Sequence, residues 1–165
     1  LSYANLEFAN ITKSKLYIAN LSNTNLEGAN LTESKLNGAN LSNANMADAT
    51  LIYSNLSKIK APGLILDGAN LKYAKFRGAN LENANLSGGF FFMTDFSAAD
   101  LTGAELNAVD LSNSVFVSSK LDYVSFKNTN VSGMDLAKYK LEKKDFINTI
   151  ICNTKLPWLD KIHEC

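Results

Sequence analysis

The most regular feature of the chain is a large apolar residue at every fifth position. The series runs from Leu1 to Leu156, and Ala61 is its one exception. A period of five fits neither an α-helix, on which successive members would lie about 140° apart, nor a strand, on which they would alternate between faces. Only a chain that turns a corner within every five residues keeps them all in one core. The pattern therefore predicts a coiled, corner-turning rod.

A second series of small residues precedes each large residue by two positions, as in Ala4, Ala9, Ser14 and Ala19. Asn is common between the two series, so the unit reads Ala-Asn-Leu-x-x, with mostly polar residues at the x positions. We expect the Asn side chains to hydrogen-bond along the coils. Glycine at the last x position supplies the positive φ that a tight corner often needs. These glycines are Gly28, Gly38, Gly68, Gly78, Gly88, Gly103 and Gly133.

The unit Ala-Asn-Leu-x-x resembles the repeat of the pentapeptide-repeat family, Ala-(Asp/Asn)-Leu-x-x. The match is close from residue 1 to about 130 and looser to about 156. The resemblance implies an all-β fold, a right-handed quadrilateral β-helix with about 20 residues in each coil of the solenoid. We expect residues 1–156 to form this β-helix, in about eight coils, and residues 157–165 to form a C-terminal cap or tail.

Two stretches depart from the unit. Around Pro62 the small and large positions exchange, with Ile59 and Leu64 in place of Ala and Ala61 in place of Leu. This stretch is either a repacked corner that absorbs the proline or a functional bend or projecting loop, and the unbroken frame makes an inserted loop unnecessary. Later the small series fails, which predicts that the last two coils are wider or irregular. The failing positions are Val124, Met134, Tyr139 and Lys144.

The C-terminal segment carries Leu156, Trp158, Leu159 and Ile162, which are apolar. We expect a short helical turn that covers the open end of the rod, because a solenoid needs terminal caps. The alternative is a homodimer contact, since the resemblance implies that members of the family that mimic DNA often pair through their C-terminal ends. The sequence leaves both interpretations open.

The two cysteines, Cys152 and Cys165, bear on the compartment. They either pair and pin the end of the chain or stay free thiols, and the sequence leaves this open. We expect a bacterial cytoplasmic protein, whereas a pair between them would favour a periplasmic, lumenal or secreted one. The chain does not begin with Met and has no signal-peptide pattern, so we expect a processed protein or a piece of a longer one.

One face of the rod is predicted to carry an apolar and aromatic patch. At a spacing of about 20 residues, six corner residues fall on the same side of three successive coils. They are Ile52, Tyr53, Lys72, Tyr73, Phe92 and Met93, with Asn113 at the edge and Phe90 on the preceding corner. Exposed apolar patches of this kind mark interaction sites, so we expect a protein partner here. The alternative is that the rings only stabilise the rod as a ladder.

Charge is balanced overall but uneven along the chain. The 16 basic and 16 acidic residues give a net charge of +0, so direct nucleic-acid binding is not expected. No apolar run approaches the roughly 18 to 20 residues of a membrane span. Between Gly78 and Ser119 there are acids but no Lys or Arg. The acids are Glu82, Asp95, Asp100, Glu105 and Asp110, and the last four are predicted to form a belt around one coil.

No catalytic, cofactor or metal motif stands out, and the one histidine, His163, lies in the tail. We therefore expect a non-enzymatic scaffold that mediates protein–protein interaction. The alternative implied by the resemblance is a DNA-mimicking regulator of DNA gyrase or topoisomerase, of the quinolone-resistance type. Such a mimic would need its carboxylates in lines along the rod, and a belt around one coil does not provide them.

Overall fold

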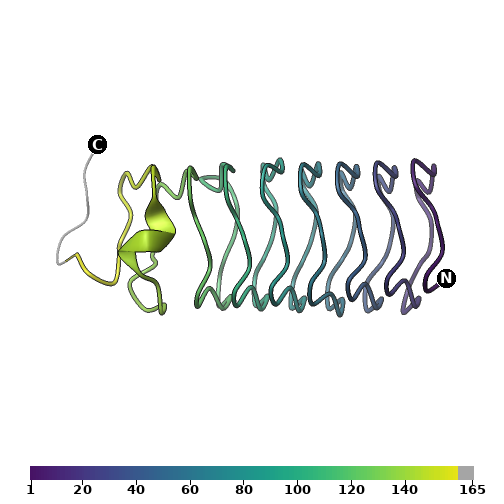
Figure 1. Cartoon of the computed structure of the whole chain (residues 1–165), viewed down its shortest axis with the longest axis horizontal. Coiled ribbons are helices and arrows are strands. Elements are labelled where there is room, and N and C mark those ends of the chain that lie inside the picture. The colour runs from purple at the N-terminus through teal and green to yellow at the C-terminus, as the bar shows by residue number, and fades with distance from the viewer. Residues whose placement is uncertain (160–165) are drawn as a thin grey trace.

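The computed structural model describes residues 1–159, which form a rod of stacked coils with the N-terminus at one end (Figure 1). Each five-residue unit contributes a turn and one extended residue that pairs with the neighbouring coils. Asn25, for example, bridges Asn5 in the preceding coil and Asn45 in the next. All bridges of the described residues are parallel and join positions 20 apart, so four units complete one coil. This agrees with the all-β architecture expected from the sequence.

One helical element interrupts the rod. It is η1, a short 3-10 helix at Lys143–Phe146, near the end opposite the N-terminus (Figure 1). The side chain of Glu142 and that of Asp145 cap each other's backbone N–H at its start. Because η1 replaces a regular corner, Lys144 is exposed although its place in the unit belongs to a small buried residue.

The corners are hydrogen-bonded turns across the two x positions. In the first unit the N–H of Ala4 donates to the C=O of Leu1 at 3.1 Å. The second x residue has positive φ, as at Gly28 (62°) and Tyr53 (58°), which is typical of a type II turn. The seven glycines named above all have the predicted positive φ. Most corners, however, reach this conformation without glycine, so the stacking of the coils rather than residue choice imposes it.

The large apolar residues fill the interior as the period predicts. From Leu21 onward nearly all of them are buried, whereas Leu6 and Leu16 in the first coil are partly exposed. Aromatic residues in one column stack from coil to coil. The rings of Phe76 and Phe96 have centroids 5.2 Å apart, and those of Phe96 and Phe116 are 5.1 Å apart. The core is therefore a continuous column along the rod.

Hydroxyl groups at the small positions have a role that the sequence pattern did not reveal. Several of them donate a hydrogen bond to the C=O of a large residue one coil back. Thr24 bonds Leu1 at 2.9 Å in this way, and Thr94 bonds Leu71 at 2.8 Å. These buried hydroxyls are thereby satisfied, and they tie adjacent coils together.

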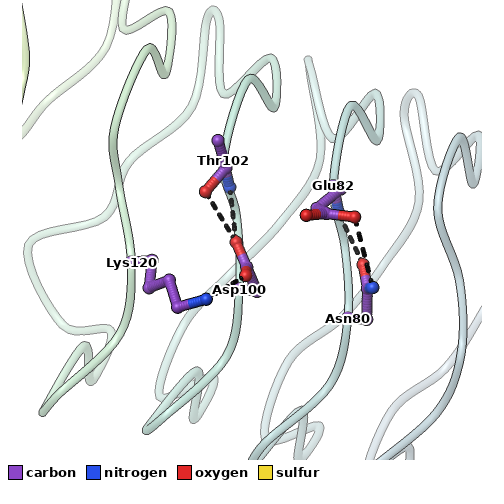
Figure 2. Close-up of polar contacts among 5 residues, drawn as sticks. All are labelled: Asn80, Glu82, Asp100, Thr102 and Lys120. Atoms are coloured by element: carbon purple, nitrogen blue, oxygen red, sulfur yellow. Dashed lines mark hydrogen bonds and ion pairs between the residues drawn. The ribbon is translucent and has the colours of Figure 1, made fainter.

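The expected hydrogen bonding of Asn along the coils is wrong for most of the chain. The Asn side-chain oxygen instead accepts from the N–H two residues later in its own unit, as from Glu82 to Asn80 at 3.0 Å (Figure 2). Aspartate does the same, and Thr102 donates to Asp100 through its N–H (3.1 Å) and its hydroxyl (2.7 Å). This local bond starts the turn in the units that carry it. It explains why Asn and Asp occupy the same position.

The stretch around Pro62 is a repacked corner. Ile59, Ala61 and Leu64 are all buried, so the exchange of large and small residues keeps the interior filled. Pro62 lies at the first x position, where a type II turn accepts proline, and its C=O still accepts from Asn43 at 3.0 Å. No loop projects here, since residues 60 and 65 keep their bridges.

The later coils are irregular, as the failing small series predicts. Within the described chain, the bridges expected between residues 115 and 135 and between residues 120 and 140 are missing. The predicted helical turn after Leu156 is not present in residues 156–159, which form a turn closed by the N–H of Leu159 on Leu156 at 3.2 Å. The helical segment lies earlier, in η1. Ile162 lies outside the described residues.

Candidate functional site

The structure brings the predicted patch together on one side of three successive coils. We call Ile52, Tyr53, Lys72, Tyr73, Phe92 and Met93 the aromatic face. Tyr53 and Tyr73 are stacked, with ring centroids 4.7 Å apart and an interplanar angle of 11°. Tyr73 meets Phe92 edge to face, with centroids 5.6 Å apart and an angle of 86°. Three rings from three coils thus form a continuous ladder.

The aromatic face is open to solvent. The exposed fractions are 59% for Tyr53, 46% for Phe92 and 53% for Met93. Phe90, on the preceding corner, is also exposed, and the Lys72 ammonium lies 5.7 Å from its ring centroid. Stacking therefore leaves much of the apolar area available, which suits a contact surface.

The third coil of the aromatic face departs from the regular column. In a strict repeat Met93 would follow Tyr53 and Tyr73, but Phe92 meets Tyr73 instead. In this described stretch, neither Phe91 nor Met93 donates its N–H to the next coil, although the corresponding residues of most other units do. The coil boundary opens there, and this frees Phe92 to tilt toward Tyr73.

A cleft of about 290 Å³ lies at this opening, beside the aromatic face. Lys72, Phe90 and Phe92 line one part of it, and Asp110 and Asn113 line another. Asn113 thus borders the patch, as the sequence indicated. The sequence did not predict the cleft, although the run of phenylalanines from residue 90 to residue 92 was a signal of crowding.

Gly89 shows how this crowding is accommodated. Glycine here takes the place of the usual small residue, and a Cβ at this position would lie 2.9 Å from the ring of Phe91. The absent side chain thus leaves room for Phe91, which stays buried in the core. The core accommodates the ring of Phe91. In this part of the described chain the bridge expected between residues 90 and 110 is missing.

The acidic belt lies directly C-terminal to the aromatic face. Asp95, Asp100 and Glu105 each bridge residues of the two neighbouring coils, and Asp110 bridges Asn130. They therefore encircle one coil, as predicted. Basic residues of the flanking coils reach two of them: Arg77 pairs with Asp95, and the Lys120 ammonium lies 2.6 Å from Asp100 (Figure 2).

The three aspartates of the belt are held in the charged form. Burial favours the neutral form of Asp100, but hydrogen bonds from Lys120 and Thr102 outweigh it and hold the pKa of this carboxyl below its usual value. The same opposition of burial and hydrogen bonding lowers the pKa of Asp95 and of Asp110. These aspartates thus favour the ionised form, and Arg77 and Lys120 partly neutralise the charge of two of them.

The C-terminal residues pack as an aromatic cluster. Phe146 lies between Phe126 and Trp158, with ring centroids 5.3 Å and 5.2 Å away. Leu156 is 3% exposed, whereas Leu159 is 41% exposed. The rings of Phe126, Phe146 and Trp158 extend the core toward the end of the rod. Whether this segment acts as a cap or as a dimer contact stays a prediction.

Other chemistry is sparse in residues 1–159. No cluster of three His, Cys, Asp or Glu side chains in this part of the chain is placed to hold a metal ion. Nor do these residues form a helix with the length and apolarity needed to cross a bilayer. Cys152 is disulfide-bonded. Cys165 and His163 lie outside the described residues, and the compartment stays a prediction.

Comparisons with known proteins agree with the five-residue repeat seen in the structure. A family model described as pentapeptide repeats matches eight copies, at residues 1–28, 25–60, 51–88 and 94–133. No curated protein is significantly similar in sequence. Among solved structures, HetL, a pentapeptide-repeat protein involved in heterocyst differentiation regulation in the cyanobacterium Nostoc sp. strain PCC 7120, is 28% identical. The similarity covers 99% of this chain and 70% of HetL, with a TM-score of 0.54.

Two further structures share less with the chain. A pentapeptide-repeat protein of the Arabidopsis thaliana thylakoid lumen is 27% identical over 65% of this chain and 71% of its own, with a TM-score of 0.45. QnrB1, a plasmid-mediated fluoroquinolone resistance protein, is 16% identical over 94% of this chain and 78% of its own, with a TM-score of 0.49. Neither likeness bears on function.

Proposed function

Because the chain belongs to the pentapeptide-repeat family, we propose that it is a non-enzymatic scaffold that binds a protein partner through the aromatic face. The rod we propose is right-handed, with about eight coils, as the family implies. The observation that carries the proposal is the ladder of Tyr53, Tyr73 and Phe92, which remains substantially exposed. The likeness to HetL, a protein involved in regulation, favours binding over catalysis.

The surroundings of the aromatic face suit a protein contact. Aromatic side chains bring large apolar area at a low cost in conformational entropy, and interfaces are enriched in Tyr and Phe. Polar Asn113 borders the patch beside Phe92, and the patch itself includes the charged Lys72. An apolar centre with a polar rim is the usual anatomy of an interface.

The test is the combined substitution of Tyr53, Tyr73 and Phe92 by Ser. We expect the folded rod to persist, because all three side chains lie at exposed corners, and partner capture from an extract of the source cells to be lost. A matched control replaces three exposed tyrosines elsewhere, Tyr3, Tyr17 and Tyr123. Capture that is equally strong with both triple variants would contradict the proposal. A variant that loses only thermal stability would show that the rings act as a stabilising ladder.

The gyrase alternative has weaker support. QnrB1 shares the fold, but at 16% identity this says nothing about a shared target. The acids form a belt around one coil, and two of them, Asp95 and Asp100, are paired with Arg77 and Lys120. A DNA mimic needs unpaired carboxylates along its length.

A DNA gyrase supercoiling assay tests this alternative. We expect micromolar protein neither to inhibit supercoiling nor to protect the enzyme from a quinolone. The control is the triple Ser variant of the aromatic face, which should behave like the unmodified protein. Inhibition or protection by the unmodified protein would establish the gyrase role and displace the scaffold proposal.

A further inference from the structure

The cleft beside the aromatic face combines exposed rings with a carboxylate. Phe90 and Phe92 line it from one coil, and Asp110 lines it from the next. We call it the Phe90 cleft. Both rings are substantially exposed, Phe90 to 56% and Phe92 to 46%. Its volume of about 290 Å³ lies at the lower end of ordinary ligand pockets, which suits one side chain of a partner rather than a whole helix or strand.

Asp110 is the one aspartate of the belt that forms no ion pair within the described chain. The other two, Asp95 and Asp100, are paired with basic residues of the flanking coils. The side chain of Asp110 instead accepts the N–H of Ser112 at 2.9 Å. Burial favours its neutral form, but hydrogen bonds from Ser112 and Asn130 outweigh this and hold the pKa of the carboxyl below its usual value. The Phe90 cleft therefore contains an ionised carboxylate without a cationic partner among residues 1–159.

The ring of Phe90 already attracts a cation on one side. The Lys72 ammonium lies 5.7 Å from its centroid, within the range of a cation–π contact. Lys72 belongs to the coil before Phe90, and Asp110 occupies the position of Phe90 in the coil after it. The two charges therefore flank the ring on opposite sides along the rod. A further cation is repelled on the Lys72 side and attracted on the Asp110 side.

The sequence around the Phe90 cleft is poor in positive charge. Between Gly78 and Ser119 the chain has five acids and no Lys or Arg. In the part of the chain that the structure describes, Lys72 is the one basic residue that lines the cleft, and it is directed at Phe90. The charge that complements Asp110 is therefore best supplied by the partner.

We propose that the Phe90 cleft receives an arginine side chain of the protein partner. Its guanidinium stacks on the exposed phenylalanine rings and donates hydrogen bonds to the Asp110 carboxylate. Arginine suits this site better than lysine, because a planar, weakly hydrated guanidinium can lie on a ring and still donate from its edge, whereas an ammonium is compact and strongly hydrated. This inference rests on the proposed function, since it names what the partner brings to the aromatic face.

The test uses two defined probes, the blocked peptide acetyl-Gly-Ser-Leu-Arg-Leu-Ser-Gly-amide and the same peptide with citrulline in place of arginine. We expect millimolar arginine peptide to give saturable shifts in the backbone amide resonances of Phe90, Phe92 and Asn113. Citrulline has nearly the same shape but no charge, so its peptide should bind about fivefold more weakly. Equal binding of the two peptides, or no shifts with the arginine peptide, overturns the inference.

Two variants of the protein locate the charge that matters. Asp110→Asn should abolish the preference for arginine over citrulline. The fold should tolerate it, because Asn130 occupies the same position one coil later and accepts the N–H of Ser132 at 3.1 Å. Glu105→Gln is the matched control, since it also removes one negative charge of the belt but does not line the cleft; it should keep the preference. Loss of the preference in both variants would implicate the overall charge and overturn the inference.

The outcome can be separated from that of the scaffold proposal. Partner capture by the triple Ser variant tests whether the aromatic face binds, and the comparison of arginine with citrulline tests what it binds. If capture depends on Tyr53, Tyr73 and Phe92 while the two peptides bind equally, the arginine inference alone is overturned. Capture that survives the triple substitution would overturn the scaffold proposal, and this inference with it.

Discussion

At the residue scale, the corners hold side chains in a conformation that L-residues rarely adopt. Lys58 and Asn43 both occur at the second x position of the same coil, with φ of 57° and 54°. This left-handed conformation costs about 1–2 kcal/mol for an ordinary residue, whereas Asn tolerates it through local hydrogen bonding. The fold therefore contains many small, separable strains.

The strain at Lys58 can be measured directly. We expect Lys58→Gly to raise the free energy of unfolding by about 1 kcal/mol, because glycine adopts this φ freely and its greater freedom in the unfolded chain offsets only part of the gain. Asn43→Gly should change it by less than about 0.5 kcal/mol. Chemical denaturation of both variants gives the comparison. A larger gain at Asn43 would mean that stacking, rather than local conformation, sets the cost.

The three belt aspartates, Asp95, Asp100 and Asp110, predict the pH dependence of stability. Their pKa is lowered in the folded protein, so their contribution is fully present above the unfolded value, about 3.9, and is lost as the pH falls through the folded value. We expect the variant with Asp95, Asp100 and Asp110 all changed to Asn to lose less stability below about pH 4 than the unmodified protein. Thermal melts from pH 7 down to about pH 2 test this; parallel curves would contradict it.

At the scale of the element, the five-residue unit was the part of the structure that the sequence predicted best. The period placed Leu21, Leu26 and the following large residues in the core because the repeat fixes which way each side chain points. The hydrogen bonds of Asn80 and Thr24 were not predictable from period, since they depend on which neighbour their polar atoms reach. A sequence period predicts whether a side chain points into the core, but not which group that side chain hydrogen-bonds.

The C-terminal element offers a test between cap and dimer contact. Trp158 packs on Phe146 edge to face. If it is a cap, Trp158→Ala should lower the free energy of unfolding by about 2–4 kcal/mol and leave the mass in solution unchanged, while Trp158→Phe should cost less. Light scattering together with chemical denaturation measures both quantities. A mass that halves on substitution, with stability retained, would instead identify a homodimer contact.

At the scale of the whole molecule, each coil contacts mainly its neighbours, so stability is close to a sum of local terms. Leu16 and Leu56 occupy the same column two coils apart, but Leu56 is fully buried and Leu16 is partly exposed. We expect Leu56→Ala to cost about 3 kcal/mol and Leu16→Ala less than half of that. Hydrogen exchange resolved by residue measures the two losses. Equal costs would contradict the idea that burial within each coil sets its contribution.

The candidate sites show where prediction from sequence ends. The six residues of the aromatic face were predictable because the 20-residue period alone brings Tyr53 and Tyr73 together. The contact of Phe92, in place of Met93, depended on hydrogen bonds lost at the coil boundary. Likewise Met134 and Tyr139 indicated a wider coil, but not that the widening would open a cleft. The positions where a bulky residue disturbs the regular packing can be read from the sequence. The shape of the opening that results can be read only from the structure.

The constant register of the bridges makes the surface a grid with two coordinates, face and coil. Moving a five-residue segment by one unit along the sequence places it on the next face, a quarter turn around the rod. Moving it by 20 residues places it one coil further along the same face. The smallest insertion or deletion that keeps existing surfaces aligned is therefore one whole coil. Removing only residues 56–60 would put Tyr53 and Tyr73 on different faces and erase their ladder. Duplication of 20-residue segments would instead lengthen the rod and keep the residues of each face aligned.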